Sequence, residues 1–218
     1  MEYIHNTEQF QFHNTVVALG KFDGMHKGHQ LIFDELIQYK QLGYQAAVFS
    51  FDRPPLNMLK HKHMRVIYTT NEKIKLLARR GIDIYIEHPF TDEFSHLSPE
   101  DFVIKVLLEK TGMKVLVVGD DCGFGYKRQG NVELLERMSK EYDFKLIVIP
   151  KLELEGEIVS STRIRHLLSE GKVEEANRLM EDPFMICGSV VHGNHMGAEV
   201  LQMPTANQIP LEDKLLPP

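Results

Sequence analysis

The most constraining feature of this sequence is the alternation of short apolar runs with longer amphipathic segments over roughly the first 150 residues. The apolar runs are rich in β-branched side chains, which is typical of strands, and span residues 15–19, 45–51, 82–86, 115–118 and 145–149. Helical periodicity fills the intervals at residues 30–42, 70–80, 99–111 and 132–140. Alternating strands and helices imply right-handed crossovers, so we predict a doubly wound α/β domain with a parallel sheet.

Local start and stop signals support these helices. Ser98 followed by Pro99 suits the N-cap and first position of one helix, while Thr69, Thr70 or Asn71 could cap another. Just past three predicted helix ends stand residues suited to left-handed C-cap conformations, namely Gly43, Gly81 and Gly112. Residues 160–180 indicate one or two further helices.

The chain changes character after residue 183. Residues 188–193 begin like a strand that leads into a Gly-rich turn, and residues 204–207 read Pro-Thr-Ala-Asn. About 35 residues cannot build much of an independent core. We therefore predict an α/β domain over residues 1–183, followed over residues 184–218 by the incomplete start of a β-rich domain.

Composition argues against several classes of function. The formal net charge of −6 gives no support to broad binding of nucleic acid or anionic membrane. No apolar run approaches the roughly 18 residues of a membrane helix, and the N-terminus lacks a signal-peptide pattern. Cys122 and Cys187 match no metal-ligand spacing, so we expect reduced thiols. A cytoplasmic protein with small-molecule ligands is expected, and its oligomeric state stays open.

Residues 16–29, VVALGKFDGMHKGH, are the most informative stretch for function. They follow a predicted strand and open a predicted helix, whose N-terminal N–H groups and positive dipole end would face a ligand. His26 and His29 are three residues apart, so two imidazoles would share the first helical turn and could bind phosphate oxygens. Tight turns and close approach of the backbone are allowed by three glycines, Gly20, Gly24 and Gly28.

Positive charge in the same stretch comes from Lys21 and Lys27. The stretch is neither a P-loop nor a dinucleotide-binding fingerprint, because the glycine spacing differs and no Gly-Lys-Ser or Gly-Lys-Thr is present. A metal site formed by the histidine pair is a weaker alternative.

The His-x-Gly-His pair after a first strand resembles the signature of the α/β nucleotidyltransferases. The fuller string Gly-x-Phe-Asp-Gly-x-His-x-Gly-His at residues 20–29 is similar to the adenylyltransferase half of the bacterial bifunctional riboflavin kinase/FMN adenylyltransferase family, the FAD synthetases. This resemblance implies a Rossmann-like fold that transfers AMP from ATP to FMN and releases FAD and pyrophosphate. It implies ATP, Mg²⁺ and FMN as ligands, with Mg²⁺ held mainly through the ATP phosphates.

Four further stretches resemble the same family in order. Residues 49–55, FSFDRPP, match a Thr-Phe-Asp-Pro-His-Pro segment, with Pro54 in place of the histidine. Residues 89–102 resemble the segment leading into the next helix. Residues 118–125, VGDDCGFG, match Gly-x-Asp-Phe-x-Phe-Gly, with Cys122 and Gly123 replacing larger residues. Residues 160–165, SSTRIR, match the family's Ser-Ser-Thr-x-Ile-Arg motif throughout.

The last motif also has a physical interpretation of its own. Hydroxyls before an apolar helical pattern cap a helix and leave N–H groups for a phosphate, and Arg163 and Arg165 could bond triphosphate oxygens. Alone, these residues would indicate only a capped helix with surface arginines, but the histidine stretch upstream favours a site.

The resemblance assigns roles to individual residues. It implies catalytic roles for His26, His29 and Arg163. It implies ATP binding by Gly20, Phe22, Asp23, Gly24, Lys27, Gly28, Ser160, Ser161, Thr162 and Arg165. It implies flavin binding by Phe51, Asp52, Asp121, Cys122 and Phe124. Asp23 or Asp121 could orient the magnesium ion.

The tail resembles the opening of the family's riboflavin kinase domain, through residues 190–193 and 204–207. Residues 197–202 depart from the usual Gly-Arg-x-Leu-Gly, and the kinase barrel with its catalytic glutamate is not in the sequence, so we expect no riboflavin kinase activity. Two alternatives stay open. One is a non-catalytic paralogue that binds flavin or nucleotide and has a regulatory role. The other is a related transferase with another acceptor, such as nicotinate mononucleotide, phosphopantetheine or glycerol phosphate.

Overall fold

The computed structural model describes residues 1–52, 65–191 and 207–218, and its centre is a six-stranded sheet. The strands run in the order β1-β4-β3-β2-β5-β6, and every pair is parallel. They are β1 (Glu2–His5), β2 (Thr15–Leu19), β3 (Gln45–Phe51), β4 (Ile84–His88), β5 (Met113–Gly119) and β6 (Lys145–Ile149). The predicted doubly wound parallel sheet is confirmed, and the five predicted strands lie within two residues of their expected bounds.

The edge strand β1 was not predicted, because its four residues are too short and too exposed to show a pattern. Its register pairs Glu2 with Ile84 and Ile4 with Ile86. The Tyr3 hydroxyl donates to Glu87 Oε2 at 2.6 Å, which fastens β1 to the neighbouring β4.

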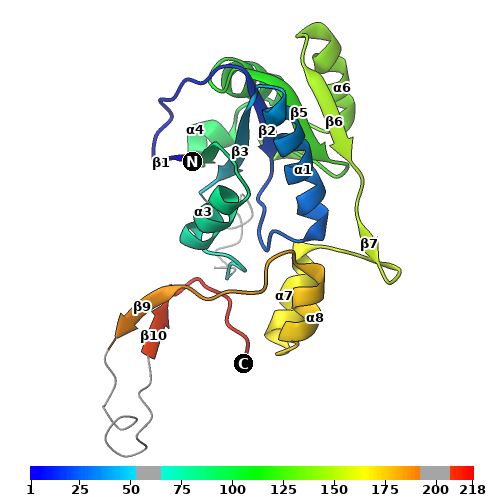
Figure 1. Cartoon of the computed structure of the whole chain (residues 1–218). Coiled ribbons are helices and arrows are strands. Elements are labelled where there is room, and N and C mark those ends of the chain that lie inside the picture. Colours follow the sequence, from blue (N-terminus) through cyan, green and yellow to red (C-terminus); the bar gives the residue numbers. More distant parts are fainter. Residues whose placement is uncertain (53–64, 192–206) are drawn as a thin grey trace, which may run out of the picture.

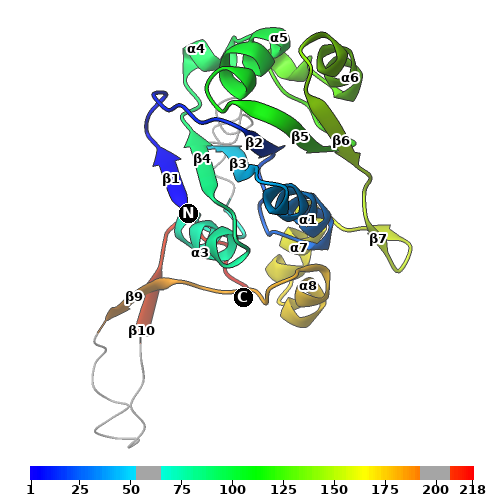
Figure 2. The ribbon, with the colours of Figure 1, turned by 45° about the horizontal axis from the view of Figure 1, so that its top comes forward.

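Helices cover both faces of the sheet (Figures 1 and 2). On one face, called the α1 face, lie α1 (Lys27–Gln41), α3 (Thr70–Arg79), α7 (Ser161–Ser169) and α8 (Val173–Leu179). On the other lie α4 (Asp92–Ser95), α5 (Pro99–Asp101), the π-helical segment η1 (Phe102–Leu108) and α6 (Val132–Glu141). Strand β2 is buried along its whole length, because Val16 and Ala18 enter one core while Val17 and Leu19 enter the other.

The predicted capping residues agree with the structure. Thr69 caps α3 in a reciprocal capping box with Glu72, and Ser98 Oγ accepts from the Asp101 amide at 3.0 Å. Positive φ angles follow at three helix ends, +95° at Gly43, +83° at Gly81 and +61° at Gly112.

The predicted continuous helix over residues 99–111 differs from the structure, which places α5 and then η1 there. The wider π turn keeps four apolar side chains on the sheet, namely Phe102, Val103, Val106 and Leu107. Backbone bonds from Glu109 to the Ile104 carbonyl and from Thr111 to the Val106 carbonyl mark this wider spacing. A single turn of 3₁₀ helix, η2 (Tyr126–Arg128), follows β5.

The C-terminal third begins with a small hairpin of β7 (Glu153–Leu154) and β8 (Glu157–Ile158), which the sequence did not predict. After α7 and α8, strand β9 (Gly188–Val191) pairs antiparallel with β10 (Asn207–Pro210), and this hairpin projects from the sheet domain (Figure 1). The last eight residues return to the α/β domain, where Lys214 and Leu215 are buried. Among the described residues, no helix is both long and apolar enough to cross a membrane.

Candidate active site

The three loops expected to form the site follow adjacent strands of the sheet. They leave the carboxyl ends of β2, β3 and β5, which are neighbours in the order β3-β2-β5. The strand order reverses between β2 and β5, and doubly wound sheets bind ligands outside the carboxyl edge at such a point. A bond from the Gly20 amide to the Phe49 carbonyl, 3.1 Å long, holds the first loop against β3.

His26 and His29 form one stacked unit at the start of α1. His26 is the N-cap, and its Nδ1 accepts from the His29 backbone amide at 3.3 Å. The two ring centroids lie 3.6 Å apart, with 20° between the planes. The predicted helix 30–42 therefore begins three residues earlier, and His26 lies just outside its first turn. Because Nδ1 of His26 accepts a hydrogen bond, the neutral ring carries its proton on Nε2 and can donate from there.

Both imidazoles are neutral near pH 7. Burial lowers the pKa of His26 to about 4, although the nearby Asp23 carboxylate opposes this shift. Burial also holds the pKa of His29 well below its usual range, and the charges of His26 and Lys73 lower it further. Nδ1 of His29 is buried and has no hydrogen-bond partner among the described residues. The pair thus carries a buried ring nitrogen to which no described residue is hydrogen-bonded.

Two glycines make this geometry possible. Gly24 has a φ of +83°, a conformation that favours glycine, and a Cβ there would lie 3.1 Å from Ile67 Cδ1. At Gly28 a Cβ would lie 3.1 Å from Nδ1 of His26, so any side chain would push the cap ring away from the helix start. The ring of Phe22 lies in the core beside His29, with centroids 5.1 Å apart, and also packs over Gly20.

Asp23 and Arg165, both predicted to bind ATP, contact each other in this structure. The Asp23 side chain is 2% exposed and its Oδ1 accepts from the amides of Ile67 at 3.0 Å and Tyr68 at 3.2 Å. Its Oδ2 is paired with the Arg165 guanidinium, and its carbonyl accepts from the Ser161 hydroxyl. These contacts join residues 20–29, which we call the histidine loop, to the N-terminal end of α7.

The N-terminus of α7 brings Arg163 to the site. Ser160 is the N-cap, and its hydroxyl accepts from the Arg163 amide at 3.2 Å, while Thr162 is exposed in the first turn. Arg163 Nε lies 2.9 Å from Glu157 Oε2 on the β7–β8 hairpin. Nη1 of Arg163 is buried and has no partner among the described residues. This nitrogen is therefore a donor near the N-terminus of α7 that no described residue satisfies.

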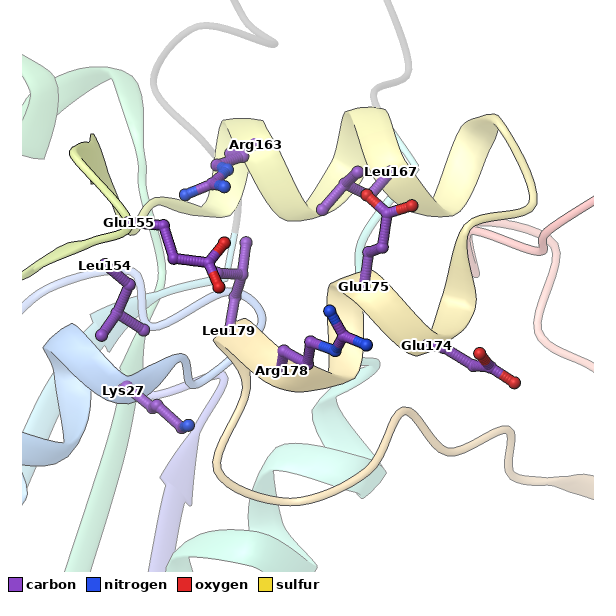
Figure 3. Close-up of a pocket in the computed structure, with 9 residues that line it drawn as sticks. All are labelled: Lys27, Leu154, Glu155, Arg163, Leu167, Glu174, Glu175, Arg178 and Leu179. Carbon is purple, nitrogen blue, oxygen red and sulfur yellow. The ribbon is translucent and has the colours of Figure 1, made fainter.

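Lys27 and Arg163 line a cavity of about 460 Å³ beside the histidine loop (Figure 3). Its walls come from α1, the β7–β8 turn, α7 and α8, and Lys27, Glu155 and Arg163 lie toward the same end. The remaining lining residues are Leu154, Leu167, Glu174, Glu175, Arg178 and Leu179. The fold thus brings Lys27 and Arg163, which are far apart in the sequence, to the same cavity.

On the opposite face of the sheet, Phe51 and Phe124 join a cluster of aromatic rings. Phe51 lies 6.4 Å from Phe102, and Phe102 lies 5.9 Å from Phe124, between ring centroids. Phe90 and Phe94 lie 5.4 and 5.6 Å from Phe51, and the buried ring of Phe49 lies 5.6 Å from Phe51. We call the rings of Phe51, Phe90, Phe94, Phe102 and Phe124 the phenylalanine cluster. The sequence prediction named only Phe51 and Phe124, although the other three lie in the stretch 89–102 that resembles the family.

The other predicted flavin residues are Asp52, Asp121 and Cys122, of which Cys122 packs against the core that contains the phenylalanine cluster. Asp52 Oδ1 accepts from the Phe90 amide at 2.8 Å, which joins the ends of β3 and β4. Asp121 is exposed and lies 3.2 Å from Lys151. Burial raises the pKa of Cys122 to about 11, so its side chain is a neutral thiol. Pro54, which replaces a family histidine, and residues 192–206 of the kinase-like tail lie outside the described residues.

Lys73 on α3 is a cation that the sequence prediction missed. It is 7% exposed, and its Nζ donates only to the Lys21 carbonyl, at 3.4 Å, within the described part of the chain. No described carboxylate lies within ion-pair distance of it. Its charge lowers the pKa of His29 and, after burial and Arg165, that of Lys21. The sequence did contain a signal for Lys73, because it places this lysine on the apolar face of the amphipathic helix α3.

Within residues 1–52, 65–191 and 207–218, no group of three or more His, Cys, Asp or Glu side chains could hold a metal ion.

A doubly wound parallel sheet, with a histidine-capped helix at the point where its strand order reverses, defines an α/β nucleotidyltransferase. The chain belongs to the FAD synthetase family, because the family model described as FAD synthetase matches residues 8–163. A second model, described as riboflavin kinase, matches residues 180–218. The predicted family is confirmed.

Several known proteins are similar over most of the chain. A bifunctional riboflavin kinase/FMN adenylyltransferase of Buchnera aphidicola is 39% identical over 94% of this chain and 66% of its own length. One from Listeria monocytogenes is 35% identical over 99% and 69%, and a protein named FAD synthetase from the same organism is 32% identical over 87% and 77%. The chain thus spans about two thirds of the bifunctional relatives.

A solved structure named as a macrolide-efflux protein from Streptococcus pneumoniae has the same fold. It superposes with a TM-score of 0.85 and 30% identity, covering 99% of this chain and 70% of that one.

Proposed function

We propose that the chain is an FMN adenylyltransferase that converts FMN and ATP to FAD and pyrophosphate. The observation that supports this most strongly is the neutral, stacked pair of His26 and His29 at the N-terminus of α1. In the proposed reaction an oxygen of the FMN phosphate attacks the α-phosphorus of ATP. The bond from that phosphorus to the bridging oxygen breaks, and pyrophosphate leaves with the electron pair. Because the attacking phosphate is already anionic, no side-chain nucleophile is needed.

The triphosphate would bind between the histidine loop and α7. His26 can donate from Nε2, and the free nitrogen of His29, Lys27 and the unpaired side of Arg163 add donors and positive charge. The N-termini of α1 and α7 contribute unpaired amides and dipole charge. These groups stabilise the charge that develops on the leaving pyrophosphate, which is the main catalytic demand of this transfer. Mg²⁺ would enter with ATP, bound through phosphates and water, and supply further charge neutralisation.

Lys73 joins this binding surface in the proposal. An isolated buried ammonium is unfavourable unless it is paired or hydrogen-bonded. Its charge acts on His29 in the ligand-free chain, so an anion bound at the histidine pair would also interact with Lys73. We therefore assign it to the triphosphate rather than to the fold.

The flavin ring would pack against the phenylalanine cluster. Aromatic faces and edges at such separations give an apolar, polarisable surface suited to a planar heterocycle. The neutral Cys122 thiol extends this surface without adding charge. The two subsites lie on opposite faces of the same sheet edge, so the acceptor phosphate would reach the histidine loop across β2 and β3. We also propose that the protein acts in the cytoplasm on these small molecules, without nucleic acid.

The test is to incubate the purified chain with FMN, ATP and Mg²⁺ and to separate the products by chromatography. FAD and pyrophosphate should form in equal amounts. Heat protection by FMN without product would instead identify a non-catalytic flavin-binding protein. Protection and turnover with nicotinate mononucleotide, phosphopantetheine or glycerol phosphate, but not with FMN, would identify a transferase with another acceptor.

A further inference from the structure

The C-terminal segment 211–218 carries a lysine buried in the α/β domain. The side chain of Lys214 has no exposed surface, nor has that of its partner Glu72 on α3. Lys214 forms a parallel β-bridge with Val66. The Val66 amide donates to the Asp213 carbonyl at 2.7 Å, and the Leu215 amide donates to the Val66 carbonyl at 2.8 Å. This region matches the riboflavin kinase model, yet its lysine lies inside the region that matches FAD synthetase.

Every donor of the Lys214 ammonium is used. Nζ lies 2.7 Å from Glu72 Oε2, 2.6 Å from the Ile67 carbonyl and 2.7 Å from the Met185 carbonyl. The rings of Tyr68 and Phe184 lie 5.1 and 4.4 Å from it, which are cation–π distances. The ammonium therefore connects three segments that are far apart in sequence.

Glu72 is saturated in the same way. Its Oε2 also accepts from the Thr69 amide at 2.8 Å, within the capping box of α3. Its Oε1 accepts from the Cys187 amide at 2.7 Å. The carboxylate thus fixes the start of α3 and the entry to the β9–β10 hairpin at once.

The network continues from Lys214 to the histidine loop. Ile67, whose carbonyl binds Lys214, donates its amide to Asp23 Oδ1, and so does Tyr68. Asp23 in turn binds Ser161 and Arg165 at the start of α7. Segment 66–68 therefore accepts a hydrogen bond from Lys214 through a carbonyl and donates two hydrogen bonds to Asp23 through its amides.

We infer that Lys214 is a positioning residue, which ties the kinase-like C-terminal segment to the loop that carries His26 and His29 through Ile67, Tyr68 and Asp23. The buried pair of Glu72 and Lys214 thereby couples the position of segment 211–218 to the position of the histidine loop. Its effect on ATP rests on the proposed function, whereas its effect on the histidine loop does not. Disturbing the C-terminal segment should loosen the loop, and a ligand that orders the loop should order the segment, because coupling between two sites is reciprocal.

The first test uses the unaltered chain and amide hydrogen exchange. ATP with Mg²⁺ should slow exchange not only at residues 20–29 and 160–165 but also at residues 211–216, by about 3-fold or more. If ATP slows exchange at residues 20–29 and 160–165 but leaves the exchange rates of residues 211–216 unchanged, the inference is overturned. If ATP protects no segment and no FAD forms, the proposed function fails, and the second test still decides the inference.

The second test compares a variant of the buried pair with a matched ion pair elsewhere. In the double variant Glu72→Gln with Lys214→Met both buried charges are removed together, which is tolerated far better than leaving one unpaired. Exchange at residues 20–29 should quicken by about 3- to 10-fold, and KM for ATP should rise by a similar factor with KM for FMN unchanged. Lys40→Met removes a lysine that binds Asp83 and the Gly81 carbonyl at the opposite edge of the sheet, and should change neither quantity. A double variant that exposes residues 211–216 but leaves residues 20–29 as protected as before would contradict the inference.

Discussion

Nδ1 of His26 accepts a hydrogen bond from the His29 backbone amide at 3.3 Å, and the two imidazole rings are stacked with centroids 3.6 Å apart. The residue that caps α1 is therefore part of the same unit as the second histidine. This arrangement fixes the tautomer of His26 and points its N–H away from the helix. Burial is the main cause of the lowered pKa of each ring, and a positive charge on His26 would lower the pKa of His29 further.

The buried histidines should make the fold acid-sensitive. The pKa of His26 is lowered from 6.5 to about 4, so between those values the unfolded chain binds a proton that the folded chain does not. The free energy of unfolding should therefore fall as the pH drops from 6.5 to about 4, with His26 contributing up to about 3 kcal/mol. Urea denaturation over this pH range measures it.

His26→Asn is the matched variant, because asparagine also caps helices but does not titrate. It should reduce the acid-dependent loss of stability. The exposed His13→Gln should leave the loss unchanged. An equally steep pH dependence in the His26→Asn variant would contradict the assigned shift.

Glu157 should compete with ATP for Arg163. The pair is 2.9 Å long and Glu157 is largely exposed, so breaking it changes little in the fold. Glu157→Gln should free the guanidinium and lower KM for ATP by about 2- to 5-fold. Glu153→Gln, on the same hairpin, is the control and should leave KM unchanged. A higher KM in the Glu157→Gln variant would show that the carboxylate helps to orient Arg163 instead.

Lys73 should affect stability and ligand binding in opposite directions. Lys73→Met removes a buried charge that has no described carboxylate partner, so the free energy of unfolding should rise by about 1 kcal/mol. The same change should weaken ATP binding by about 10-fold, because a charge-assisted contact to the triphosphate is lost. Chemical denaturation and ATP titration measure the two effects.

Lys75 offers the control for this prediction. It lies on the same helix, and its Nζ is 3.6 Å from Cys187 Sγ at an exposed position. Lys75→Met should change neither stability nor ATP binding appreciably. A Lys73→Met variant that loses stability while keeping its ATP affinity would place Lys73 in the fold rather than in the site.

The phenylalanine cluster should govern FMN alone. Phe51→Leu removes the ring contacts with Phe49, Phe90, Phe94 and Phe102, and each aromatic pair contributes about 0.5–1.5 kcal/mol beyond its buried area. KM for FMN should rise by about 10-fold while KM for ATP stays the same. Phe144→Leu, in the same core but outside the cluster, should leave both constants unchanged. An equal rise in both constants would indicate general damage to the fold.

Local patterns in the sequence were enough to predict five of the six strands of the sheet, the helices α1, α3 and α6, and the histidine loop. Strands such as β2 are buried on both faces and read as continuous apolar runs, and Ser98 and Thr69 mark helix starts through bonds to residues three positions away. The same locality predicted that His26 and His29 would meet. The local pattern could not show that His26 precedes α1 and serves as its N-cap.

The missed features depend on contacts between distant residues. Asp23 is 142 positions from Arg165 and Glu72 is 142 positions from Lys214, so no local pattern links them. The predicted role of Asp23 in ATP binding stays a prediction, and the sequence could not show that its carboxylate contacts Arg165 and two backbone amides. Strand β1 was missed because its stability comes from pairing with β4 and from the bond of Tyr3 to Glu87.

The most direct test of the central claim is the turnover number for FAD formation by the His29→Ala variant, measured beside the unaltered chain and the exposed His13→Gln control. If the stacked pair stabilises charge on the leaving pyrophosphate, His29→Ala should lower kcat by about 10²-fold or more, as the loss of an oxyanion donor does. His13→Gln should retain full turnover. A folded His29→Ala variant that forms FAD at the unaltered rate would contradict the role of the histidine pair.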